Sequence, residues 1–157
     1  MDTDKHGFKH KDISDKIIRV FYEVYNELGH GFLESVYERS LEIALNSLEL
    51  KVRRQIQIPV WFRGKPVGDF TADMLIEDCV LLELKAARAL DSSHQAQLLN
   101  YLRATEIEVG LLLNFGLKPE FKRLIFDNSR KAIRGNPRIS IADLLVADRG
   151  DDNSPPS

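Results

Sequence analysis

The 157-residue sequence contains a single cysteine, Cys79, which excludes an internal disulfide framework and an all-cysteine metal site. No apolar run approaches the roughly 20 residues that a membrane-spanning helix needs. The amino-terminal residues are charged and lack the apolar stretch of a secretory signal. We therefore expect one soluble domain in a reducing compartment, the cytoplasm, with no membrane partner.

The net charge is only −2, but the charges are unevenly distributed. Residues 51–65 contain no acid, residues 66–117 are acidic, and basic side chains return in residues 118–138. An acidic segment between basic ones suits a metal-dependent enzyme that acts on a polyanion. The alternative is that these charges only solvate the surface. We expect four cations of the first basic stretch to bind nucleic acid: Arg53, Arg54, Arg63 and Lys65.

Hydrophobic periodicity predicts the secondary structure. Apolar residues at helical spacing predict helices over about 13–28 and 32–48, separated by a corner or a kink at Gly29-His30-Gly31. The remaining predicted elements are strands at about 55–62, 67–76 and 79–86, a helix at about 92–105, and strands at about 109–115 and 121–126. Pro59 places the first strand at an edge or at a bulge. This order is typical of a mixed sheet with helices packed on it.

The sequence divides into three parts. Residues 1–12 are expected to be a flexible leader, and residues 13–126 form the folded body. Residues 127–157 begin basic and end rich in Pro, Ser and Asp, so we expect this extension to be partly disordered. A short helical turn at about 139–146 is possible.

An acid and a lysine interrupt an apolar strand in Val80-Leu81-Leu82-Glu83-Leu84-Lys85. Side chains two apart share a face of a strand, so Glu83 and Lys85 point the same way. A three-residue turn at 77–79 would pair Asp73 with Glu83, whereas a two-residue turn would place them on opposite faces. We predict the three-residue turn, because it gathers the charges in one place.

Two converging carboxylates are hard oxygen ligands of the kind that magnesium prefers. A lysine beside them could hold an attacking water, and this set suits phosphodiester hydrolysis. The alternative is a buried Glu–Lys pair, or strand-end charges that reach solvent.

Four motifs in order resemble a known family. They are Gly31-Phe32-Leu33-Glu34-Ser35-Val36-Tyr37, the acid Asp73, Glu83-Leu84-Lys85, and His94 to Leu102, in which Gln97 and Tyr101 are spaced Q-x-x-x-Y. Together they resemble the GxxExxY protein family, a branch of the PD-(D/E)XK nuclease superfamily. One departure is Ala72, which stands where the superfamily name has proline.

The resemblance implies an α/β, restriction-endonuclease-like fold, a mixed sheet flanked by helices. It also implies a hydrolase, an endonuclease dependent on Mg²⁺ or Mn²⁺ and acting most plausibly on DNA. Asp73 and Glu83 would hold the metal, Lys85 would position the nucleophile, and Glu34 would add a third carboxylate directly or through water. Gly31 would let the helix approach the sheet closely.

The resemblance also implies three supporting residues. The Tyr37 hydroxyl could steady Glu34 or reach a phosphate, although a core aromatic is an equal alternative. Gln97 and Tyr101 share a helix face and could orient Lys85 or the nucleic-acid strand. The alternative for this pair is an ordinary polar helix face.

Two rival functions remain open. One is a catalytically silent module that keeps the fold and binds nucleic acid or protein. The other is a dimerising interaction protein that uses Trp61 and the edge strand. Trp61 could stack on a base, cover a helix or lie in a dimer interface. A homodimer or an accessory protein would also suit the nuclease, because no extended recognition region is visible.

Overall fold

Two helices that meet at a corner begin the fold. They are α1 (Lys11–Leu28) and α2 (Glu34–Ser47) in this computed structural model, which describes residues 9–131 and 139–145. The corner depends on Gly29 and Gly31, whose φ angles of 71° and 109° disfavour other residues. The corner alternative is therefore correct. Nothing outside the adjacent residues lies within 4 Å of a Cβ built on Gly31, so the expectation that Gly31 lets the helix approach the sheet closely is wrong.

The first helix begins earlier than the sequence predicted. Lys11 and Asp12 are already helical, and an ion pair of 2.6 Å joins Lys11 Nζ to Asp15 Oδ2 one turn later. The flexible leader predicted over 1–12 is therefore wrong for its last two residues. Residues 1–8 lie outside the described part of the chain.

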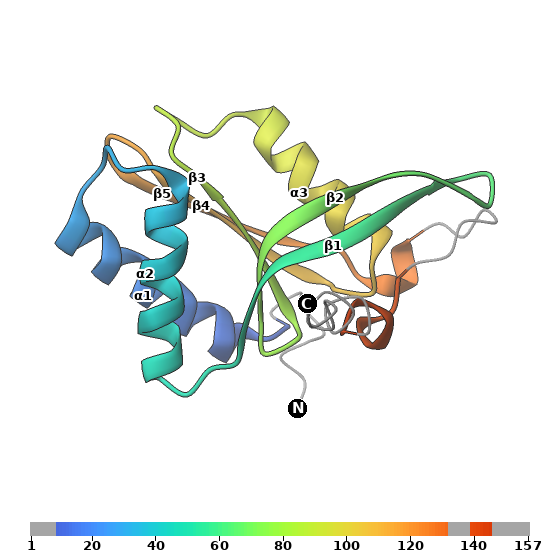
Figure 1. Ribbon diagram of the computed structural model, residues 1–157, viewed down its shortest axis with the longest axis horizontal. Helices are drawn as coiled ribbons and strands as arrows, with labels where there is room; N and C mark the ends of the chain where they lie inside the picture. The colour runs from blue at the N-terminus through green and yellow to red at the C-terminus, as the bar shows by residue number, and fades with distance from the viewer. Residues whose placement is uncertain (1–8, 132–138, 146–157) are drawn as a thin grey trace, which may run out of the picture.

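The described residues form one five-stranded sheet in the order β1-β2-β3-β4-β5, visible in Figure 1. The strands are β1 (Val52–Phe62), β2 (Lys65–Ile76), β3 (Val80–Lys85), β4 (Val109–Phe115) and β5 (Pro119–Ile125). Only β3 and β4 run parallel, because α3 (Ser92–Ala104) crosses between them. The predicted mixed sheet is confirmed, and β1 is an edge strand as Pro59 indicated.

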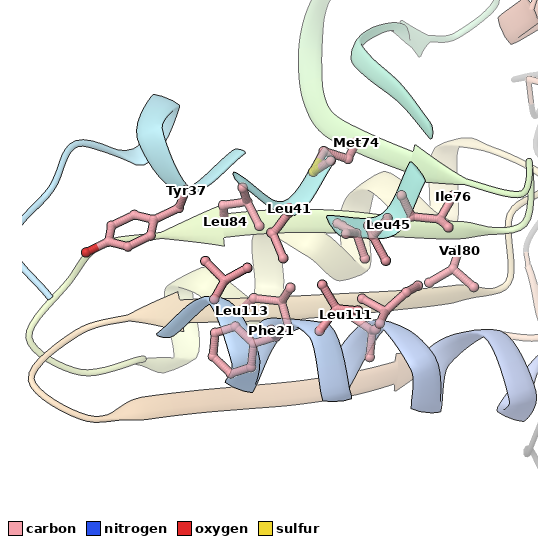
Figure 2. Close-up of a cluster of buried hydrophobic side chains, with 14 of the residues drawn as sticks. Phe21, Tyr37, Leu41, Leu45, Met74, Ile76, Val80, Leu84, Leu111 and Leu113 are labelled. Carbon is pink, nitrogen blue, oxygen red and sulfur yellow. The ribbon is translucent and has the colours of Figure 1, made fainter. Parts of the chain in front are cut away.

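Two hydrophobic cores lie on the two faces of this sheet. On the α1–α2 face, Phe21, Leu41 and Leu45 pack against alternate residues of β3 and β4, as Figure 2 shows. On the α3 face, Leu98 and Leu102 pack against the opposite set of side chains. All seven residues of β4 are buried, which explains its unbroken apolar sequence.

Part of the carboxy-terminal extension belongs to the fold. Ile139 donates its N–H to the Ala104 carbonyl at 2.9 Å, and its own carbonyl accepts the Glu106 N–H at 2.9 Å. A helical segment over residues 141–145 follows and buries Leu144 in the core of the α3 face. Within the described ranges, no helix has the length and apolarity to span a bilayer.

Candidate active site

The acids Asp73 and Glu83 lie where β2 separates from β3. The paired positions of these strands run from Ile76–Val80 to Met74–Leu82 and then stop. Beyond that point the Asp73 N–H donates to Glu83 Oε1 at 3.1 Å, and the Leu84 N–H donates to Asp73 Oδ2 at 2.7 Å. Each carboxylate thus satisfies a backbone donor of the other strand. The predicted register, which brings Asp73 beside Glu83, is confirmed.

The side chains of β1 and β2 change from one face of the sheet to the other at this point, and this change creates the opening. Residues two apart in a regular strand share a face, yet Ala72 packs in the α3-face core and Met74 in the α1–α2 core. In β1, Val52 packs on the α1–α2 core, whereas Ile56 lies in the α3-face core. The pairing skips from Arg54–Met74 to Ile56–Ala72, and Gln55 has a positive φ of 56°. The backbone therefore bends at Gln55, directly opposite Asp73.

Burial and mutual repulsion perturb both carboxylates. Burial, followed by the charges of Glu38 and Glu34, raises the pKa of Asp73 to about 6 despite the Leu84 hydrogen bond. Burial and the charge of Asp73 raise the pKa of Glu83 to about 8. Two desolvated acids facing each other are unfavourable without a compensating cation.

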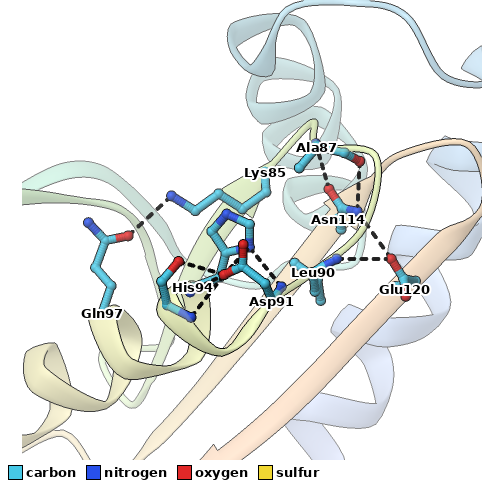
Figure 3. Close-up of polar contacts among 9 residues, drawn as sticks. Lys85, Ala87, Leu90, Asp91, His94, Gln97, Asn114 and Glu120 are labelled. Carbon is cyan, nitrogen blue, oxygen red and sulfur yellow. Dashed lines mark hydrogen bonds and ion pairs between the residues drawn. The ribbon is translucent and has the colours of Figure 1, made fainter.

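A hydrogen bond to α3 holds the Lys85 side chain in place. Its Nζ donates to Gln97 Oε1 at 3.1 Å, as Figure 3 shows. The start of α3 is fixed by Asp91, which accepts the N–H groups of Ser93 and His94, while His94 Nδ1 accepts the Asp91 N–H. This capping box fixes the first turn of the helix that carries Gln97.

The loop between β3 and α3 is anchored from β4. The Asn114 side chain accepts the Ala87 N–H at 2.9 Å and donates to the Ala87 carbonyl at 3.0 Å (Figure 3). A Cβ on Gly116 would lie 2.3 Å from that carbonyl, so only glycine fits there. These contacts restrain the chain two residues after Lys85.

Tyr101 closes the α3 side of the site. Its ring stacks on Phe70 of β2, with the centroids 3.6 Å apart. Burial and the charges of Glu83 and Asp73 raise the pKa of its hydroxyl to about 12. Tyr101 is therefore near the acids, and the Q-x-x-x-Y motif faces the site.

Helix α2 contributes two acids, of which the sequence analysis identified one. Glu34 is exposed at the first residue of α2. Glu38, one turn later, is buried, and its charge raises the pKa of Asp73 more than the charge of Glu34 does. Glu38 accepts from Gln55 Nε2 at 2.9 Å and pairs with Arg54 at 3.3 Å. The four-residue spacing from Glu34 was the available signal for this second acid.

Tyr37 has the structural role that was left open. The side chain is fully buried, and its ring stacks on Phe115 at a centroid distance of 4.0 Å. The hydroxyl donates to the Gly29 carbonyl at 2.6 Å and accepts the Phe32 N–H. The expectation that this hydroxyl steadies Glu34 or reaches a phosphate is therefore wrong in this structure. Tyr37 instead holds the corner from which α2 begins.

The four predicted nucleic-acid-binding cations do not form one surface. Arg53 pairs with Asp78 at 2.9 Å, and Arg54 pairs with Glu38 and Glu42. Arg63 and Lys65 lie instead at the tip of the β1–β2 hairpin. The bend at Gln55 directs Arg54 toward α2. Nucleic-acid binding by the four cations stays a prediction.

Trp61 packs, partly buried, against the core of the α3 face. This packing is compatible with each of the three alternatives for Trp61, so base stacking, helix covering and a dimer interface all stay predictions.

The carboxylate pair fits a divalent cation in part. Asp73 and Glu83 are adjacent hard-oxygen donors, and burial is the main cause that raises the pKa of both. Among the described residues, no three His, Cys, Asp or Glu side chains are grouped closely enough to hold a metal ion. The expectation that Glu34 completes a three-carboxylate ligand set is therefore wrong as a direct contact. Its charge does reach both acids, which leaves a contact through water.

These features define a class of protein: an α/β domain of restriction-endonuclease-like fold, with an acid–acid–lysine site where β2 separates from β3 in its mixed sheet. A family model described as the PD-(D/E)XK nuclease superfamily matches residues 11–124. The chain belongs to this superfamily.

Other comparisons add little. A search of curated proteins found no match. The crystal structure of SSO0001 is similar with a TM-score of 0.47 and 19% sequence identity, over 77% of this chain and 59% of that one. This chain thus spans less than two thirds of that protein.

Proposed function

We propose that this protein is a metal-dependent nuclease that hydrolyses phosphodiester bonds of nucleic acid. The observation that carries the proposal is the pair of hydrogen bonds from the Asp73 N–H to Glu83 and from the Leu84 N–H to Asp73, which holds the two carboxylates side by side. Lys85, on the same strand face as Glu83, adds the cation that this chemistry needs.

Each residue has a defined role in the proposal. Asp73 and Glu83 would hold Mg²⁺ or Mn²⁺, with Glu34 contributing through water. A divalent cation bound there lowers the pKa of a water and neutralises charge that develops on the phosphate. Lys85 positions the attacking water, and Gln97 orients Lys85 through the 3.1 Å hydrogen bond. Tyr101 limits solvent access from the α3 side.

The proposal makes three finer assignments: membership of the GxxExxY family, DNA as the substrate and cutting at internal bonds. The motif residues from Gly31 to Tyr37 form the corner and first turn of α2, which presents Glu34 toward the acids. The substrate in this proposal is DNA, cut internally. A homodimer or an accessory protein would enlarge the recognition surface, since the domain has little beyond its core elements.

The test is cleavage of labelled single- and double-stranded DNA and RNA, linear and circular, with Mg²⁺, with Mn²⁺ and with EDTA. We expect metal-dependent cutting that falls by at least about 100-fold in Asp73→Asn and Lys85→Met. Asp69→Asn is the matched control, because it removes an exposed acid from the same strand. Cutting that persists in Asp73→Asn, or that needs no metal, would contradict the proposal.

Membership of the superfamily does not exclude the rival function, a catalytically silent binding module. Its prediction is tight binding of nucleic acid with no cutting of any substrate at any metal concentration. The presence of Asp73, Glu83 and Lys85 together favours the enzyme. Desolvating two adjacent acids is unfavourable, and a silent module would need neither these acids nor the lysine beside them.

A further inference from the structure

The β1–β2 hairpin extends beyond the rest of the sheet. Strand β3 pairs only with residues 74–76 of β2, so the distal part of the hairpin is a two-stranded ribbon, seen reaching outward in Figure 1. Its strands remain paired to the tip, through Trp61–Pro66 and Phe62–Lys65. Residues 60–67, here called the arm, are therefore a hydrogen-bonded element that needs no ordering to act.

The arm exposes apolar and cationic side chains together. Phe62 is 57% exposed and Val67 is 63% exposed. The Arg63 guanidinium lies 5.0 Å from the centroid of the Phe62 ring, and Lys65 is opposite Phe62 in the register. No acidic residue occurs between Ile56 and Gly68, and the nearest acid on the hairpin is Asp69, which pairs with Pro59.

We propose that the arm is a second contact for the nucleic-acid substrate, with Arg63 and Lys65 on its phosphates and Phe62 on its sugars or bases. This rests on the proposed function, because one polyanion must reach both Asp73 and the arm. The charge of the arm favours nucleic acid over a second copy of this chain. Its two cations complement phosphates, whereas they would repel the same cations on another arm.

The geometry predicts where this contact falls. Lys65 and Asp73 lie on the same strand, and at about 3.3 Å per residue they are separated by at most about 26 Å. Duplex DNA advances about 3.4 Å per base pair, so the arm reaches up to about 8 base pairs from the cut. Substrate on that side should therefore need a flank of this length.

The binding test uses Asp73→Asn protein with a 30-base-pair duplex in EDTA, which separates binding from cutting. Arg63→Asn with Lys65→Gln removes both cations and keeps the turn, because Asn-Gly suits its positive φ angles. We expect affinity to fall roughly tenfold at 0.1 M salt, and the slope of log K against log salt to fall by about 2. Lys118→Gln with Lys122→Gln is the control, since it removes the same charge from the opposite edge of the sheet.

The cutting test uses duplexes whose flank on one side of the cut shortens from 14 to 3 base pairs. Wild type should lose rate once the flank is shorter than about 8 base pairs, and the arm variant should be slow and insensitive to this length. Unchanged affinity, salt slope and length dependence in the arm variant would overturn the inference. So would a wild-type dimer in solution that Phe62→Asp makes monomeric without weakening DNA binding. If no substrate is cut but the arm still governs binding, the proposed function fails and the arm contact stands.

Discussion

At the scale of residues, the site depends on two acids that are held together against their electrostatic preference. The hydrogen bond from the Asp73 N–H to Glu83 and the one from the Leu84 N–H to Asp73 fix both carboxylates on the backbone. The fixed geometry prevents the two side chains from turning apart to relieve their repulsion. In the proposed function, a bound divalent cation would offset this repulsion.

Glu83→Gln should make the metal-free protein more stable at alkaline pH. Burial raises the pKa of Glu83 to about 8, so the folded state loses stability as pH rises through that value, while below about pH 4.5 the acid is protonated in both states. We expect the variant to gain roughly 1–3 kcal/mol over wild type at pH 9 in EDTA, and the difference to vanish near pH 5.

Urea unfolding across this pH range measures the difference. The same variant should lose the stabilisation that Mg²⁺ gives to wild type. A variant less stable than wild type at pH 9 would show that the Glu83 charge is compensated, contrary to the proposed cation site.

Gln97→Ala should lower kcat with little change in KM. Gln97 touches Lys85 and acts through it, so its loss frees the amino group without removing the charge. A decrease of roughly tenfold in kcat is expected, against at least about 100-fold for Lys85→Met. Asn100→Ala, an exposed residue one turn along α3, is the control. Equal losses in kcat for both α3 variants would mean that the helix, and not the Gln97 amide, matters.

At the scale of elements, the bend in β1 and β2 creates the opening in which the acids lie. Three hydrogen bonds tie the turn between β2 and β3 to the start of β1: Lys51 and Arg53 both donate to Asp78, and Glu77 accepts the Lys51 N–H at 2.6 Å. The bend itself depends on Gln55, whose left-handed backbone is costly for a residue other than glycine.

Gln55→Val should therefore be much more harmful than Gln55→Gly. A β-branched residue resists positive φ, so the valine variant should lose roughly 2 kcal/mol and most of its metal-induced stabilisation. Glycine adopts this backbone freely and should stay within about 1 kcal/mol of wild type, although it loses the hydrogen bond to Glu38. Gln57→Val, exposed two residues along the same strand, controls for valine itself.

Thermal unfolding with and without Mg²⁺ measures both effects. Tolerance of valine equal to that of glycine would show that the bend does not need the left-handed residue.

At the scale of the whole molecule, the carboxy-terminal extension completes the core of the α3 face. Residues 139–145 cover the end of α3, and the buried Lys131 amino group donates to the Thr105 and Ile107 carbonyls at 2.8 Å each. The extension therefore supports the helix that carries Gln97 and Tyr101, although it lies beyond the matched residues 11–124.

Leu144→Ala should lower the free energy of unfolding by roughly 2–3 kcal/mol, the usual cost of a cavity in a core. Asp143→Ala, its exposed neighbour, should stay within about 0.5 kcal/mol of wild type. Denaturant unfolding measures both. Equal stability of the two variants would mean that the segment does not pack on the domain in solution.

The sequence by itself determined the order of the elements, the fold class and the identity of the acid–acid–lysine set. The order of the elements and the mixed sheet follow from local periodicity and from turn lengths, which act over a few residues. The restriction-endonuclease-like fold was implied by the resemblance of the four motifs. Even the pairing of Asp73 with Glu83 needed only the parity of one turn.

Only the tertiary structure decided what surrounds that set. The positive φ of Gln55 and the docking of Leu144 carry no periodic signal, because each depends on contacts between segments far apart in the chain. The placement of the four cations also depends on tertiary structure, because the bend in the strands directs Arg54 to α2 and leaves Arg63 on the arm. Local patterns determine which side chains share a strand face, and long-range packing determines where that face bends.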